Sequence, residues 1–212
     1  MIIFDVETDG LLQDVTKIHC MVAKDTDTQQ VFKAVGHAEV TKLFKEISKQ
    51  TLAGHNIMGY DLPVVEKVLG LTHDGEVFDT LVATRTIWPN LRDLDQRKKT
   101  VRPQFTGSHS LDAWGQRLRF FKGDYGKQEN AWDEYTPEML EYCEQDVELN
   151  HKVFERIVAK NFPPAALEME HEMHRLLLQQ ERIGFPFSVE KAQALYSILS
   201  DRKQSIADEL AE

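Results

Sequence analysis

The sequence has few cysteines, no long apolar run and no excess of positive charge. Its 212 residues contain two cysteines, Cys20 and Cys143, whose spacing matches no zinc motif. Reduced, partly buried thiols are therefore expected. No apolar run is long enough to span a membrane, and the first residues lack the basic segment of a signal peptide. These absences argue against a membrane protein or a disulfide-rich secreted one and predict a cytoplasmic location.

The net charge of −10 argues against a simple electrostatic DNA clamp, because such proteins are usually basic. It does not exclude a nucleic-acid enzyme, since metal-binding carboxylates add negative charge that bound cations neutralise. The cations are unevenly distributed, and one polar, basic run extends from Arg92 to Arg102. We interpret this run either as a solvated loop or as a contact to the backbone of single-stranded DNA.

The stretch from Ile2 to Thr8 is the starting point for predicting a functional site. Its β-branched apolar residues predict a buried strand that runs into an acidic pair, Asp5 and Glu7. Side chains alternate along a strand, so both carboxylates should point to the same face. Two neighbouring carboxylates at the end of a buried strand repel each other unless a cation lies between them. The alternative is a strand end that runs into an acidic turn.

The hydrophobic pattern of the remaining chain alternates between strand and helix periods. A hairpin is expected at 17–24 and 30–35, and two short strands at 52–56 and 77–79. Helical spacing predicts helices at 37–49, 60–71, 80–88, 111–118, 136–160, 165–182 and 188–211. The polar, aperiodic range 90–108 is expected to be a long exposed loop.

Further carboxylates occur in two spaced motifs, Asn56-x-x-x-Tyr60-Asp61 and Tyr142-x-x-x-Asp146. On a helix, positions i and i+4 share a face, so the last two side chains can address one site. The chain thus offers four acids from three separate parts, namely Asp5, Glu7, Asp61 and Asp146. Hard oxygen ligands without His or Cys spacing favour Mg²⁺ or Mn²⁺ over zinc. Four acids can hold two such ions at the ~3.5–4 Å spacing that phosphodiester chemistry uses.

These motifs resemble the three exonuclease motifs of the DEDD superfamily, in its Tyr branch. That branch includes the 3′–5′ proofreading exonuclease domains of family A DNA polymerases. Three further blocks are similar to the replicative polymerases of short-tailed bacteriophages, so the resemblance covers essentially the whole chain. The blocks are Phe78-Asp79-Thr80-Leu81, Gly107-Ser108-His109-Ser110-Leu111-Asp112-Ala113-Trp114-Gly115 and Glu181-Arg182-x-Gly184-Phe185-Pro186-Phe187.

The resemblance implies an α/β fold, an RNase H-like mixed five-stranded sheet flanked by helices, with a C-terminal helical extension. Residues 1–162 would form the 3′–5′ exonuclease domain. Residues 163–212 would be a helical segment resembling the start of a polymerase domain. The sequence departs from the family because the palm, fingers and thumb are absent from these 212 residues. Polymerase activity is therefore not expected, and a separate polymerase chain could dock on the C-terminal helices.

The resemblance also implies roles for single residues. Asp5, Glu7 and Asp146 would hold one divalent cation, and Asp5 with Asp61 would serve a second one, both Mg²⁺ or Mn²⁺. Tyr142 and the Glu7 carboxylate would orient the attacking water, although a phenol with its ordinary pKa of about 10 is a poor general base.

Four further positions are candidate substrate contacts. By the resemblance, Thr8 and Leu11 match positions that contact the terminal nucleotide, and Asn56 matches one that fixes the site near Asp61. Leu11 could equally be a core residue. His109 is either a phosphate contact or a structural, solvated side chain.

The implied function is a metal-dependent 3′–5′ exonuclease that removes single nucleotides from DNA 3′ ends and releases 5′-monophosphates. Single-stranded or frayed ends should be preferred, because the scissile phosphate must reach the acids. Two alternatives stay open: an RNA 3′-trimming exonuclease, and a non-catalytic docking module for a separate polymerase chain. The location would be the host cytoplasm if the chain is phage-encoded.

Overall fold

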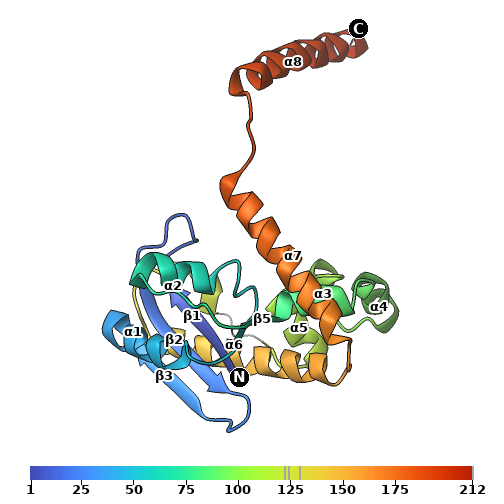
Figure 1. The fold of residues 1–212 in the computed structure, drawn as a ribbon. Helices are drawn as coiled ribbons and strands as arrows, with labels where there is room; N and C mark the ends of the chain where they lie inside the picture. Colours follow the sequence, from blue (N-terminus) through green and yellow to red (C-terminus); the bar gives the residue numbers. More distant parts are fainter. Residues whose placement is uncertain (122, 124, 129, 212) are drawn as a thin grey trace. The chain divides into compact units, whose positions relative to one another are not determined.

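The computed structural model describes residues 1–121, 123, 125–128 and 130–211. It divides into two compact units, Met1–Arg175 and Leu176–Glu212. The first unit is built on a single sheet (Figure 1). The strands of this sheet are β1 (Ile2–Thr8), β2 (Ile18–Asp25), β3 (Val31–Val35), β4 (Leu52–Gly54) and β5 (Val77–Asp79).

The five strands lie in the order β3-β2-β1-β4-β5, so the first strand is central. β2 pairs antiparallel with β1 and with β3, which makes the predicted hairpin, whereas β4 pairs parallel with β1 and with β5. The register between β1 and β2 shifts between Glu7 and Thr8. Such irregularities bend a strand and re-aim its side chains next to functional sites.

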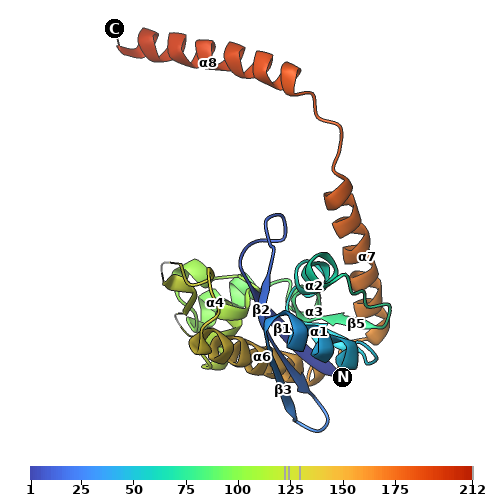
Figure 2. The same cartoon turned by 90° about the vertical axis from the view of Figure 1, so that its left-hand side faces the viewer.

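Helices cover both faces of the sheet, with α1 and α2 on one side and α6 on the other (Figures 1 and 2). In the first unit the complete α-helices are α1 (Gly36–Ile47), α2 (Asp61–Leu69), α3 (Thr80–Ile87), α4 (Leu91–Lys98), α5 (Leu111–Leu118) and α6 (Pro137–Val158). Two 3₁₀ turns, Pro103–Phe105 and Tyr125–Lys127, lie in the connections before and after α5. A mixed sheet flanked by helices confirms the predicted α/β architecture.

Successive side chains of β1 point to opposite faces of the sheet, as the period of two predicts. Phe4 points to the α1 face, where its ring centroid lies 6.0 Å from that of Phe44. Ile3 points to the opposite face and packs in one buried cluster with Cys143 and Val147 of α6. Asp5 and Glu7 follow Ile3 at steps of two, so they lie on the α6 face.

The range 90–108 was expected to be a loop, and this expectation is wrong, because it contains α4 and one 3₁₀ turn. The helix has no continuous apolar stripe. It is held instead by Leu91 and by the buried Asp95, whose carboxylate accepts two hydrogen bonds from Arg117 of α5 (3.0 and 2.6 Å) and one from the Gly107 N–H (2.9 Å). An ion pair between residues 22 positions apart leaves no local signal in the sequence.

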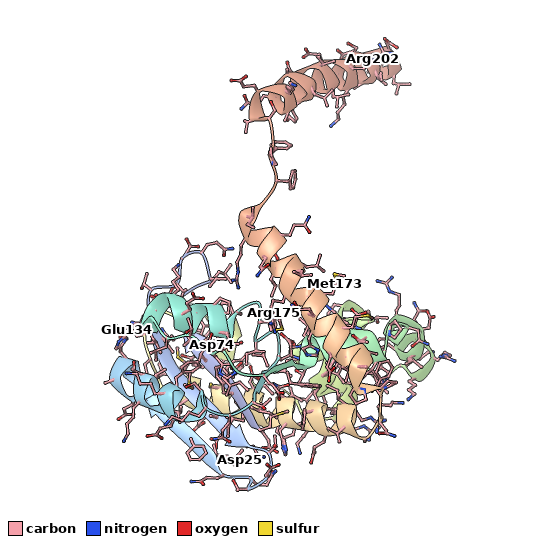
Figure 3. The ribbon with its side chains drawn as sticks, in the orientation of Figure 1. Asp25, Asp74, Glu134, Met173, Arg175 and Arg202 are labelled. Carbon is pink, nitrogen blue, oxygen red and sulfur yellow. The ribbon has the colours of Figure 1, made fainter. Side chains whose placement is uncertain are left out.

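Two further helices follow, α7 (Pro164–Ile183) and α8 (Val189–Ala211). The boundary between the two compact units falls within α7, after Arg175, which Figure 3 labels. The second unit exposes several large apolar side chains, namely Phe185, Phe187, Leu195, Tyr196, Ile198 and Leu199. Among the residues that the structure describes, no helix combines the length and the apolar character that crossing a membrane requires.

Candidate active site

Asp5 and Glu7 lie beside the thiol of Cys143, which α6 presents to the same face of β1. One ligand atom from each of these three residues lies within 4.8 Å of the other two. The Cys143 thiol donates to the backbone oxygen of Asp5 (3.4 Å) and approaches its carboxylate oxygen Oδ2 (3.8 Å). Burial raises the pKa of this thiol well above its ordinary value, and Cys20, Asp5 and Glu7 add to the effect.

Asp61, in the first turn of α2, lies near this group but outside it. Its carboxylate is 3% exposed and accepts a hydrogen bond from the backbone N–H of Val6 (3.3 Å), which ties it to β1. Burial, followed by the nearby Asp5 carboxylate, raises the pKa of Asp61 well above its ordinary value. The structure therefore brings Asp61 next to Asp5 although 56 positions separate them in the sequence.

Tyr142 and Asp146 lie one helical turn apart on α6, as their spacing predicts. Asp146 is buried, and Tyr142 is half-buried between Tyr125 and Trp132, with ring centroids at 5.8 and 5.9 Å. In the part of the chain that the structure describes, the compact ligand set contains Asp5 and Glu7 but neither Asp61 nor Asp146. Like charges keep buried carboxylates apart unless a cation screens them.

The donor set fits a divalent cation. Asp5, Glu7 and Asp61 present hard carboxylate oxygens, the ligands that Mg²⁺ and Mn²⁺ prefer. Burial raises the pKa of Tyr60 beside them, and the charges of Asp61, Glu7 and Asp5 raise it further. A cation between these acids would relieve the repulsion that these shifts report.

Asp79 is a positioning residue whose importance the sequence did not reveal. It is 0% exposed, and its Oδ1 accepts hydrogen bonds from the N–H groups of Asn56 (3.0 Å) and Leu81 (2.9 Å). Its Oδ2 accepts a hydrogen bond from the N–H of Met58 (3.2 Å). One carboxylate thus caps α3 and also holds the turn that leads into Asp61. The backbone N–H of Asp79 in turn donates to Nε2 of His171 in α7 (2.8 Å).

The candidate substrate contacts have different environments. Thr8 is buried, donates to the Gly10 backbone oxygen (3.0 Å) and contacts the Tyr60 hydroxyl. Leu11 is 72% exposed, so the alternative that it is a core residue is wrong. Asn56 adopts a left-handed backbone conformation (φ 67°) in the turn that Asp79 holds.

Two cavities have candidate site residues in their lining. The first has a volume of about 540 Å³, and Asn56, Arg85, Ser108 and His109 are among its lining residues. Asn56 and His109, two of the candidate substrate contacts, thus line the same cavity. The second has a volume of about 470 Å³ and is lined by aromatic and polar side chains, among them Arg102, Phe105, Phe121, Trp132 and Tyr142.

Three residues found at the site were not predicted from the sequence to belong to it, namely Cys143, Tyr60 and Asp79. Cys143 could have been found, because it precedes Asp146 by three positions and therefore shares its helix face. Tyr60 belongs to the second motif but carries no charge that would single it out. Asp79 stands at the end of β5 and is the N-cap of α3, and its bonds to the turn after β4 leave no local signal in the sequence.

The sheet order and the helices on both faces define an RNase H-like fold. The chain shares this fold with Brucella melitensis NrnC with bound Mg²⁺, at 20% sequence identity and a TM-score of 0.53, over 88% of this chain and 87% of that one. The predicted fold class is thereby confirmed. No protein-family model matches the chain.

Within this class the chain is similar to particular proteins, two phage DNA-directed DNA polymerases. It is 30% identical to that of Escherichia phage T7 and 30% identical to that of Enterobacteria phage T3, each over 259 aligned positions that cover the whole chain. The chain spans 37% of the length of each polymerase. The resemblance to phage DNA polymerases that the sequence predicted is confirmed.

Proposed function

We propose that this chain is a metal-dependent 3′–5′ exonuclease that hydrolyses single nucleotides from DNA 3′ ends and releases 5′-monophosphates. The observation that carries the proposal is the group of acids around β1. Asp5 and Glu7 lie together, Asp61 is tied to the same strand, and α6, which packs on that strand, carries Tyr142 and Asp146. The similarity of the whole chain to phage DNA polymerases supports DNA as the substrate.

Two divalent cations, Mg²⁺ or Mn²⁺, complete the proposed site. Asp5, Glu7 and Asp146 would hold one cation, and Asp5 with Asp61 would hold the other. Bound there, the cations would activate the attacking water and stabilise the leaving 3′ oxygen. NrnC, which shares the fold, is known with bound Mg²⁺, and this supports the choice of cation.

In the proposed mechanism, side chains of the site orient the reactants. The Glu7 carboxylate accepts a hydrogen bond from the attacking water and fixes its direction. The Tyr142 hydroxyl donates to the same water or to the scissile phosphate. Its aromatic neighbours, Tyr125 and Trp132, restrict the rotation of the ring and so fix the position of that hydroxyl. We expect Thr8, Leu11 and Asn56 to contact the terminal nucleotide, and His109 to contact a phosphate.

The proposal is tested with a single-stranded DNA oligonucleotide labelled at its 5′ end, incubated with the purified chain and Mg²⁺. We expect a ladder of products that shorten by one nucleotide at a time, and 5′-monophosphates as the released species. Internal cutting, or shortening from the 5′ end, would contradict the proposal. A matched RNA oligonucleotide tests the alternative substrate, since faster cleavage of RNA would identify an RNA-trimming enzyme.

A separate polymerase chain is a proposed partner of the second unit. The support is the set of apolar side chains that Leu176–Glu212 exposes, together with the similarity to polymerases. We expect the exonuclease and its polymerase partner to work in the cytoplasm. If the chain is phage-encoded, this is the cytoplasm of the host cell. Co-expression with a candidate polymerase tests the partner. If Phe185→Asp with Leu199→Asp does not weaken co-purification, the second unit is not the contact.

A further inference from the structure

An exposed cationic surface lies on α4 and the segment that follows it. We call it the α4 cationic surface, and its members are Arg92, Arg97, Lys98, Lys99 and Arg102, all of them exposed. They lie within eleven positions of a chain whose net charge is −10. The two acids of the helix do not cancel this charge, because Asp95 is buried against Arg117 and Asp93 is a single anion.

The backbone beneath these cations is fixed. Asp95 is 4% exposed, and its paired hydrogen bonds with Arg117 fasten α4 to α5. The segment after α4 is fastened too, since the Arg102 N–H donates to Oε1 of Gln116 (2.9 Å) and the Gly107 N–H donates to Asp95 (2.9 Å). A partner that binds here therefore loses little chain entropy, because the binding groups are already held in place.

The α4 cationic surface adjoins both cavities of the candidate site. Arg102 belongs to the surface and also lines the 470 Å³ cavity that contains Tyr142. Arg92 packs against Gly107, where an added Cβ would lie 3.0 Å from the Cβ of Arg92, and Gly107 lines the 540 Å³ cavity that contains Asn56. The surface thus borders two cavities that each contain a candidate site residue, Asn56 in one and Tyr142 in the other.

Cations beside exposed aromatic rings are the combination that binds single-stranded nucleic acid without sequence preference. The 470 Å³ cavity provides the rings, with Phe105, Phe121 and Trp132 in its lining, and Phe121 is 60% exposed. The α4 cationic surface provides the charge.

We propose that the α4 cationic surface binds the phosphate backbone of the single strand, on the 5′ side of the nucleotide that is removed. This proposal rests on the exonuclease function and names the surface that holds the rest of the substrate. The cations act on binding and not on the reacting phosphate. Removal of these cations should therefore weaken the binding of long substrates and leave the hydrolysis of the shortest substrates unchanged.

The test uses the triple variant Arg97→Ala, Lys98→Ala, Lys99→Ala. Its matched control is Lys42→Ala, Lys45→Ala, Lys49→Ala, which removes the same charge from exposed positions on and next to α1, at the other end of the unit (Figure 1). Two substrates are compared, a single strand of about twenty nucleotides and a dinucleotide that has no upstream phosphates. Fluorescence anisotropy measures binding of the long strand at several salt concentrations, and hydrolysis of both substrates gives kcat and KM.

For the α4 variant we expect Kd and KM for the long strand to rise by about tenfold or more, with kcat unchanged. The slope of log Kd against log salt should fall by about 2, since each single-strand phosphate contact contributes ~0.7. Dinucleotide hydrolysis should equal that of wild type, and the α1 control should change none of these quantities.

Three results would overturn the proposal: a Kd and salt slope equal to wild type, an equal loss in the α1 control, or a loss of dinucleotide hydrolysis together with binding. The last result would mean that these cations act at the acids or in folding. If wild type hydrolyses neither substrate, the exonuclease function is refuted, and the anisotropy measurement still decides whether the surface binds a strand.

Discussion

The substitution Asp79→Asn tests how the fold holds Asp61. In the wild type, Oδ1 accepts hydrogen bonds from the N–H groups of Asn56, Leu81 and Val82, and Oδ2 accepts one from Met58. An asparagine has one oxygen, and its amide nitrogen donates and does not accept. The best arrangement keeps the three bonds to Oδ1 and leaves the N–H of Met58 facing another donor.

The expected cost follows from this geometry. An unsatisfied buried donor costs about 1–3 kcal/mol, and hydrogen bonds to a neutral oxygen are weaker than those to a carboxylate. We therefore expect Asp79→Asn to lower the free energy of unfolding by about 2–4 kcal/mol. The turn from Asn56 to Met58 should also loosen, and Asp61 follows Met58 by three positions. Substitution of a residue that positions a metal ligand typically reduces activity by about 10–100-fold, so kcat/KM should fall by that amount.

Urea denaturation followed by tryptophan fluorescence measures the loss of stability, and oligonucleotide hydrolysis measures the loss of activity. The matched control is Asp74→Asn, since Asp74 is exposed in the loop between α2 and β5 and loses the same charge (Figure 3). If Asp79→Asn unfolds within about 0.5 kcal/mol of this control, the carboxylate does not hold the turn and the reasoning fails.

Three further predictions concern single side chains near the site. Burial lowers the pKa of His109 to about 4, so at pH 4–6.5 the unfolded chain binds more protons, and stability should fall as the pH falls through this range. His109→Gln should flatten that dependence, which urea titrations at several pH values measure; an unchanged dependence would contradict the prediction. Leu11→Ala should leave the free energy of unfolding unchanged because the side chain is 72% exposed, yet raise KM for single-stranded DNA by about 5-fold. An unchanged KM would remove Leu11 from the substrate contacts. Cys143→Ala should keep hydrolysis with Mg²⁺ within about threefold of wild type but weaken inhibition by Cd²⁺, because thiol ligands select soft cations. Equal Cd²⁺ inhibition of both proteins would contradict the proximity of the thiol to the Asp5 carboxylate.

Much of the fold could be predicted because its signals are local. The apolar, β-branched run before Asp5 favoured a short buried strand over a helix, and alternation placed Asp5 and Glu7 on one face. The helix predicted at 136–160 is α6, and Thr136 is its N-cap, where its side chain accepts a hydrogen bond from the Met139 N–H. The predicted hairpin of β2 and β3 was correct for the same reason, since turn residues separate two apolar runs.

The rest depends on contacts between distant residues. α4 forms because Asp95 meets Arg117, and no pattern within 90–108 reports this. The position of Asp61 beside β1 follows from the parallel pairing of β1 with β4, which places the turn after β4 next to Val6. The link from Asp79 to His171 joins residues 92 positions apart. The division of the chain at residue 162 into an exonuclease domain and the start of a polymerase domain stays a prediction.

The acids on β1 are central to the function proposed for this chain, and the double substitution Asp5→Ala, Glu7→Ala tests them most directly. The measurement is the rate of Mg²⁺-dependent shortening of a 5′-labelled single-stranded DNA, compared with that of wild type. Removal of a single electrostatic contributor typically costs about 10²–10³ in kcat, so the loss of two ligands should reduce the rate by at least about a thousandfold. A double variant that shortens DNA as fast as the wild type would show that the active site lies elsewhere.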